Sequence, residues 1–171
     1  MNIKISGIAN DSIVDGEGIR FTIFTQGCPH HCPHCHNPQT HDPNGGYEEN
    51  TENLIAMIAQ NPLLDGITLS GGEPIQQPLP CSILAQSAKK MGLTVWLYTG
   101  YTWEELLAKN DKAIQKLLHF TDVLIDGTFI YELRSLELSF KGSSNQRTID
   151  VQKSLLQHSV VLWQKKPYLF R

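Results

Sequence analysis

Several common features of protein sequences are missing from this chain of 171 residues. Its 14 basic and 17 acidic residues give a net charge of −3, and no block of Lys and Arg stands out. Sequence-independent nucleic-acid binding needs such clustered cations, so we expect no nucleic-acid partner. No apolar run approaches eighteen residues, and the N-terminus has no long apolar signal region. We therefore expect no membrane association and a cytoplasmic location.

Cysteine is also scarce: the chain has four, and three of them lie in the segment Cys28-Pro-His-His-Cys32-Pro-His-Cys35. An odd group of three cannot pair off in disulfides, and a reducing compartment suits free thiolates as metal ligands. The fourth, Cys81, lies in a helical pattern and is expected to be a small core residue. The sequence also has no internal repeat, linker or low-complexity stretch, so one domain over residues 1–171 is expected.

Apolar runs and amphipathic stretches alternate along the chain, which predicts an α/β fold. The expected strands read as apolar runs, as in a parallel sheet with helices outside. A complete eight-unit barrel needs about 250 residues, so we expect an incomplete (β/α) barrel of five or six units. The expected strands are residues 3–8, 19–25, 66–70, 93–98, 122–126 and 160–163. The expected helices include residues 51–60, 79–91 and 148–156, with a capping box at Thr102 and Glu105.

The three clustered cysteines predict a metal site in a bent loop directly after a strand. Gly27 breaks the strand, and prolines keep the segment out of a regular helix. Three thiolates are one short of the four that usually hold a cubane iron–sulfur cluster, which would leave one iron open. Structural zinc is the competing interpretation, because Cys28, Cys32, Cys35 and His36 could form a Cys3His site.

The Cys-x3-Cys-x2-Cys spacing resembles that of the radical S-adenosylmethionine superfamily. The resemblance implies a radical-SAM type of incomplete barrel and a [4Fe-4S] cluster held by Cys28, Cys32 and Cys35. It also implies that the open iron binds S-adenosylmethionine, whose reductive cleavage gives a deoxyadenosyl radical. The neighbours of the last ligand, His34 and His36, are then expected near this cofactor together with Cys35. His34 stands where the superfamily usually has an aromatic residue, and its imidazole can also stack on adenine.

A second motif, Ser70-Gly71-Gly72-Glu73-Pro74, follows the next expected strand. The carboxyl ends of barrel strands carry the active site, and glycines without side chains allow close approach of a ligand to backbone carbonyls. By the same resemblance, Ser70, Gly71, Gly72 and Glu73 are expected to bind the amino group of S-adenosylmethionine. A turn is the ordinary alternative for each such motif alone. The two motifs in consecutive loops favour the cluster over zinc.

Further segments resemble the glycyl-radical activating enzymes. Asp15-Gly-Glu-Gly-Ile-Arg20 is similar to their Asp-Gly-Pro-Gly-x-Arg segment, and residues 96–101, 126–133 and 136–147 resemble the activating proteins of anaerobic ribonucleoside-triphosphate reductase. The resemblance implies the large reductase subunit as partner and a low-potential electron donor such as flavodoxin. It implies no catalytic side chain, because the cluster and the cofactor carry the chemistry. Cys35-His36-Asn37-Pro38 instead resembles the pyruvate formate-lyase activator. A radical enzyme acting on a small molecule remains a further alternative.

Overall fold

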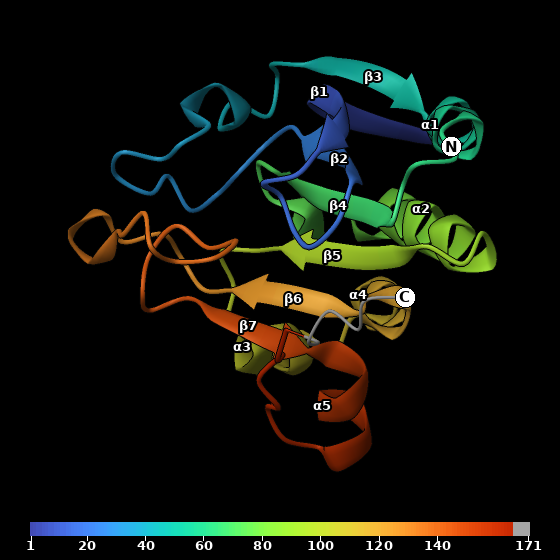
Figure 1. The fold of residues 1–171 in the computed structure, drawn as a ribbon. Coiled ribbons are helices and arrows are strands. Elements are labelled where there is room, and N and C mark those ends of the chain that lie inside the picture. Colours follow the sequence, from blue (N-terminus) through green and yellow to red (C-terminus); the bar gives the residue numbers. More distant parts are fainter. Residues whose placement is uncertain (166–171) are drawn as a thin grey trace.

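The computed structural model describes residues 1–165, which form a seven-stranded sheet flanked by helices (Figure 1). The spatial order is β3-β1-β2-β4-β5-β6-β7. The four central strands β2, β4, β5 and β6 are parallel, whereas β1, β3 and β7 pair antiparallel at the two sides. The expected α/β class and the parallel centre are confirmed. The strands are β1 Asn2–Ser12, β2 Arg20–Thr25, β3 Tyr47–Asn50, β4 Gly66–Gly71, β5 Thr94–Tyr98, β6 Val123–Asp126 and β7 Arg147–Asp150.

Helices α1 to α4 lie in the connections between the parallel strands, and four of the five helices within residues 1–165 begin at a residue whose side chain caps them. Asn50 accepts a hydrogen bond from the backbone N–H of Glu52 at the start of α1, so the cap lies one residue before the expected Thr51. The expected capping box of Thr102 and Glu105 is present at α3. Gly92, with φ +79°, follows the end of α2 as expected. The helices are α1 Thr51–Gln60, α2 Pro78–Lys90, α3 Trp103–Ala108, α4 Lys112–Phe120 and α5 Val151–Gln157.

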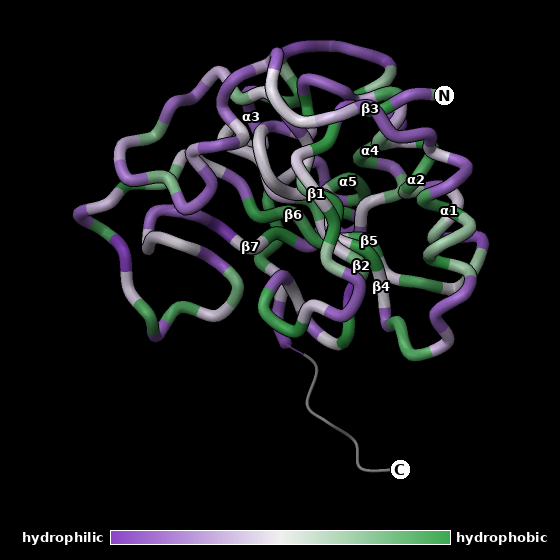
Figure 2. The backbone as a smooth tube through the Cα atoms, turned by 90° about the horizontal axis from the view of Figure 1, so that it is seen from above, coloured by the Kyte–Doolittle hydropathy of each residue, from purple (hydrophilic) through white to green (hydrophobic). Residues whose placement is uncertain are grey.

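Alternation along the strands gives the sheet two different faces, because successive side chains of a strand point to opposite sides. On one face, residues such as Ile23, Leu69 and Leu97 pack against the helices in the main core. On the other face, Trp96, Val123 and Ile125 form a smaller apolar cluster. Figure 2 shows hydrophobic stretches gathered along the central strands and the helices beside them, whereas the outer loops alternate between hydrophilic and hydrophobic stretches.

Two expectations near the C-terminal end of the described chain were wrong. Residues 147–150, expected to begin a helix at Thr148, form strand β7, in which Ile149 is fully buried opposite Leu124. The helix begins only at Val151, where Asp150 caps it by accepting from the backbone N–H of Lys153. The expected strand at residues 160–163 is reduced to one isolated bridge between Leu162 and Ile149. In both places a tertiary pairing decided the local structure.

Strand β3 follows a stretch that was expected to be irregular. It pairs with β1 although its sequence Tyr-Glu-Glu-Asn shows no apolar alternation.

Within residues 1–165, no helix combines the length and the apolar character that crossing a membrane requires.

Candidate metal and cofactor site

The cysteine loop leaves the carboxyl end of β2 and is fixed by a returning segment. The backbone N–H of Gly27 donates to the carbonyl of Thr40 at 2.8 Å, and that of Cys28 donates to the carbonyl of His41 at 3.2 Å. Gly27 has φ +93°, a conformation that glycine adopts without strain. His31 and His34 also have positive φ values, of 46° and 57°. The chain therefore bends tightly between the cysteines, as the prolines and Gly27 predicted.

All three clustered cysteines line one cavity of about 140 Å³, shared with the loop after β4. Ser70, Gly71 and Gly72 contribute to the same wall. None of the three cysteines forms a disulfide, and each is partly accessible. The carboxyl ends of adjacent parallel strands thus bring both sequence motifs together. This juxtaposition is the central observation at the site.

The donor set around this cavity fits an iron–sulfur cluster. Burial raises the pKa of the Cys28 thiol, while the backbone amides of His30 and His31 act to lower it. Burial likewise raises the pKa of Cys32, opposed by the backbone amide of Phe129. The Asn37 N–H donates to the Cys35 sulfur at 3.4 Å. Each of the three sulfurs therefore has a backbone donor beside it, and hydrogen bonds to cluster sulfurs are a normal part of such sites.

Binding of a metal or cluster by these thiols would displace their protons, because the thiolate is the form that binds metal. Within the described residues, no three Cys, His, Asp or Glu side chains already converge on a point where one metal ion would sit. A four-iron cluster does not require the side chains to converge on one point, because each cysteine thiolate binds a different iron atom. Cys81 lies apart, fully buried in α2, where burial raises the pKa of its thiol strongly.

Gly71 and Gly72 are required by the protein's own backbone. A Cβ atom on Gly71 would lie 2.6 Å from the Cα atom of Phe24, and one on Gly72 would lie 2.5 Å from the carbonyl oxygen of Gly27. Gly71 also has φ +96°. The N–H of Gly72 donates to the carbonyl of Thr25 at 2.8 Å. The close neighbours of these glycines are thus the end of β2 for Gly71 and the start of the cysteine loop for Gly72, whereas the expected approach of a ligand to their backbone stays a prediction.

Glu73 links three segments of the site. Its carboxylate is completely buried and accepts hydrogen bonds from the Thr99 hydroxyl at 2.9 and 3.0 Å, the Gly100 N–H at 2.9 Å and the Ile75 N–H at 3.0 Å. Its Oε2 also lies 2.9 Å from Nε2 of His30, which stands between the first two cysteines. Glu73 therefore ties the ends of β4 and β5 to the cysteine loop. It lies behind the cavity wall and is not among the residues that line the cavity.

His30 is a residue that sequence reasoning did not single out among five nearby histidines. Its ring packs edge-on against Tyr101, with centroids 4.5 Å apart, and its partner is the Glu73 carboxylate. A Cβ on Gly100 would lie 2.4 Å from the His30 ring, so Gly100 provides the space for it. His30 differs from the other four histidines in its contact with Glu73 of the second motif. This contact could not be predicted from the sequence, because it depends on β2 and β4 lying side by side.

A second cavity of about 340 Å³ adjoins the first along Cys35, Ser70 and Tyr98. His36 lines this second cavity, and its ring lies 4.8 Å from that of Phe129. His34 lines neither cavity; it is exposed and packs against Tyr131 with a centroid distance of 4.3 Å. The structure thus places His36 beside the space next to the thiols and His34 outside it.

The segment after β6 closes one side of the second cavity. Phe129 and Gln146 line both cavities, and the Gln146 side chain fixes the loop by donating to the carbonyl of Gly127 at 2.9 Å and accepting from the N–H of Gly142 at 2.9 Å. Arg147 forms ion pairs with Asp126 and Glu104. The resemblance to the activating proteins had already singled out residues 126–147, and Phe129 and Gln146 are the residues of this segment that line both cavities.

The Asp15–Arg20 motif has a structural explanation. Arg20 is fully buried, and its guanidinium donates to the hydroxyls of Thr68 at 2.7 Å and Thr94 at 3.0 Å. Burial lowers its pKa to about 10. Gly16 and Gly18 have positive φ values, and a Cβ on Gly16 would meet the Arg20 side chain at 2.7 Å. The glycines therefore allow the loop to fold over the buried arginine.

Comparison with known proteins identifies the family. A family model described as a 4Fe-4S single cluster domain matches residues 14–149. The anaerobic ribonucleoside-triphosphate reductase-activating proteins of Salmonella typhi and of Escherichia coli K12 are each 37% identical to this chain over 142 residues, covering 78% of it and 90% of their own length. This chain belongs to that family of activating proteins.

A second kind of relative is more distant. The pyruvate formate-lyase 1-activating enzyme of Escherichia coli K12 is 32% identical over 166 residues, which are 94% of this chain and 65% of that enzyme. The resemblance to activating enzymes is confirmed, and with it the 4Fe-4S cluster expected from the cysteine spacing. The match to a 4Fe-4S family also removes the case for a structural zinc module.

Proposed function

We propose that this chain activates anaerobic ribonucleoside-triphosphate reductase by generating a glycyl radical on the large subunit of that enzyme. Cys28, Cys32 and Cys35 would hold a [4Fe-4S] cluster with one open iron. When bound, the cluster and S-adenosylmethionine supply the electron and the radical that removes a hydrogen atom from the partner's glycine. The observation that carries the proposal is the shared cavity of the three thiols and residues 70–72.

The adjoining cavity supports a site for S-adenosylmethionine. Its volume of about 340 Å³ lies within the usual range of roughly 300–1,000 Å³ for small-molecule pockets. Cys35, His36 and Ser70 line it, and Gly71 and Gly72 lie at the border with the thiol cavity. In the proposed arrangement the backbone of residues 70–72 accepts from the cofactor's ammonium group. Glu73 positions that backbone from behind, and His34 would approach adenine only after leaving Tyr131.

The open arrangement of the sheet supports a protein substrate. We propose that the chain forms a single domain, an incomplete barrel of the radical-SAM type, in which the open side admits the partner's glycine loop. The loop would then close the site and exclude water around a reactive radical, as closed active sites do. A low-potential donor such as flavodoxin would supply the electron, since iron–sulfur potentials reach roughly −700 mV at the low end. We also propose a cytoplasmic location and expect no nucleic-acid or membrane partner.

A pyruvate formate-lyase-type activator is the second candidate, favoured by the 32% identity that covers 94% of this chain. The reductase activators are favoured over it, because the match to them is 37% identical and spans 90% of their length, whereas the match to the pyruvate formate-lyase activator is 32% identical and spans 65% of its length. A radical enzyme acting on a small molecule would need no protein partner at all. The three candidates differ in what accepts the radical.

Electron paramagnetic resonance (EPR) spectroscopy tests the proposal directly. The reduced, cluster-loaded protein is mixed without oxygen with S-adenosylmethionine and the anaerobic reductase. A glycyl-radical doublet should appear with deoxyadenosine in proportion, and replacement of the partner's acceptor glycine by alanine should abolish the doublet. A doublet obtained only with pyruvate formate-lyase would support the second candidate. If neither protein gave a doublet while a metabolite drove deoxyadenosine release, the activase function would be refuted.

A further inference from the structure

His41 has a buried ring nitrogen that the proposed function does not use. Its Nε2 atom is shielded from solvent and has no hydrogen-bond partner within residues 1–165. Leaving a buried polar group unpaired is unfavourable, so nearly all such groups have a hydrogen-bond partner in native proteins. The position of His41 indicates which partner this is.

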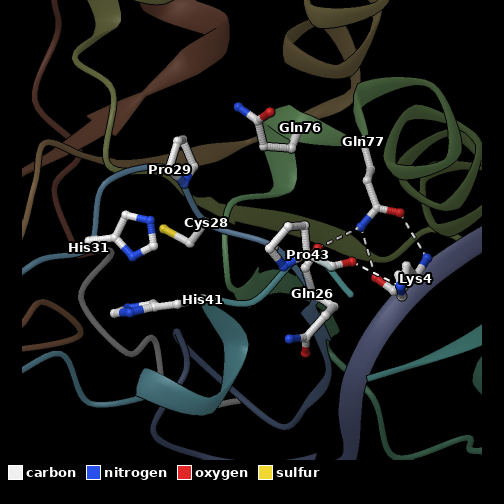
Figure 3. A pocket seen from close by; sticks show the side chains of 10 residues that line it. Lys4, Gln26, Cys28, Pro29, His31, His41, Pro43, Gln76 and Gln77 are labelled. Atoms are coloured by element: carbon white, nitrogen blue, oxygen red, sulfur yellow. Dashed lines mark hydrogen bonds between the residues drawn. The ribbon is translucent and has the colours of Figure 1, made fainter. Parts of the chain in front are cut away.

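The His41 ring forms part of the wall around the thiols. It lines the cavity that Cys28, Cys32 and Cys35 share, and also a second cavity of about 430 Å³ that includes Cys28 and His31. Figure 3 shows the Cys28 sulfur turned toward the side where the His31 and His41 rings lie. The carbonyl of His41 accepts from the Cys28 N–H, and its ring packs edge-on against His31 at 5.1 Å. Two contacts therefore hold His41 beside Cys28.

We propose that the Nε2–H group of His41 donates a hydrogen bond to a sulfur atom at the Cys28 corner of the cluster and raises its reduction potential. The inference rests on the proposed ligation by Cys28. Reduction adds negative charge to the cluster, so a donor at a sulfur stabilises the reduced form more than the oxidised form. Because the carbonyl of His41 is hydrogen-bonded to the Cys28 N–H, the sulfur nearest to His41 is expected at the iron that Cys28 binds, not at the open iron, which has no cysteine ligand.

The test compares His41→Phe, which removes the donor, with His41→Gln, whose amide nitrogen can take the place of Nε2. His119→Phe is the control, because His119 lies on α4 and lines neither the thiol cavity nor its neighbours. Each protein is loaded with iron and sulfide without S-adenosylmethionine, its iron and sulfide are assayed, and its cluster is titrated by potential with EPR detection.

We expect His41→Phe to retain the cluster and to lower the ratio of reduced to oxidised cluster about tenfold at a fixed potential. This corresponds to a shift of about −59 mV for one electron, in line with the loss of one hydrogen bond to a charged group. His41→Gln should recover most of the shift, and His119→Phe should show none. An unchanged midpoint in cluster-loaded His41→Phe would overturn the proposal.

Pulsed EPR of the reduced native protein labelled with ¹⁵N-histidine provides a test that does not depend on the folding of His41→Phe. A weak histidine-nitrogen coupling that disappears in His41→Gln is the expected result. Absence of any such coupling, or a strong coupling typical of an iron-bound nitrogen, would overturn the proposal. Failure of the ligand assignment is separate: it would appear as Cys28→Ala protein that keeps its full iron content.

Discussion

Replacement of Glu73 by Ala should destabilise the protein even before any metal or cofactor is bound. The buried carboxylate accepts four hydrogen bonds from protein donors on Thr99, Gly100, Ile75 and His30. Removing one partner of a buried charged network costs roughly 3–5 kcal/mol, because the remaining buried donors lose their acceptor. Total stabilities of natural domains are roughly 5–15 kcal/mol, so the loss is a large fraction.

The measurement is thermal unfolding of metal-free, reduced protein followed by circular dichroism. For a chain of this size, 1 kcal/mol shifts Tm by roughly 2–4 °C, so Glu73→Ala should lower Tm by about 6–20 °C. Glu73→Gln retains the shape and one acceptor atom, and its loss should be smaller. Glu137→Ala is the matched control, because Glu137 is exposed in the loop after β6, and exposed sites usually change stability by less than about 0.5 kcal/mol.

The two possible roles of Glu73 give opposite results in this assay. If its carboxylate served only to bind S-adenosylmethionine, the metal-free Glu73→Ala protein would be as stable as the native protein. An unchanged Tm would therefore refute the structural role assigned from the four hydrogen bonds. A lowered Tm in Glu73→Ala together with near-native cofactor affinity in Glu73→Gln would show that the residue acts by positioning residues 70–72.

Two further predictions concern the loops themselves. Cys28→Ala, Cys32→Ala and Cys35→Ala should each lose the cluster in iron and sulfide assays, whereas Cys81→Ser should keep it because Cys81 is a core residue of α2; iron loss confined to Cys81→Ser would contradict the ligand assignment. Gly72→Val should lose the cluster as well as cofactor binding, because its side chain would displace the Gly27 carbonyl next to Cys28. Gly7→Ala, with nothing within 4 Å of the added Cβ, is the control, and a cluster-loaded Gly72→Val protein would refute the steric argument.

The sequence predicted the elements that carry their own local signals. The capping residue Thr102, the helix-ending Gly92 and the apolar runs of β2, β4, β5 and β6 all appear where expected. The spacing of the cysteines predicted that three thiols would gather at one cavity, because three cysteines in one loop lie close together in any fold. These features depend on residues a few positions away in the chain, so the sequence alone is enough to predict them.

The features that were not predicted depend on distant partners. Residues 147–150 have no strand signal of their own, and β7 forms because Ile149 is buried beside β6. The role of Glu73 depends on Thr99 and His30, which are 26 and 43 residues away. The close neighbour of Gly72 is likewise Gly27, on a different strand end. In each case the chemistry of the residue was visible in the sequence, but its partner was not.

The same contacts imply that the two loops of the site behave as one unit. The N–H groups of Gly72 and Glu73 donate to the carbonyls of Thr25 and Gly27, and the Glu73 carboxylate holds His30. A shift of the loop after β4 must therefore move the backbone on both sides of Cys28. Cluster binding at the cysteines should in turn order residues 70–73, where the cofactor's ammonium group is proposed to bind. Cofactor affinity is then expected to depend on cluster loading for two reasons: the open iron supplies a ligand position, and the cysteine loop fixes the backbone acceptors.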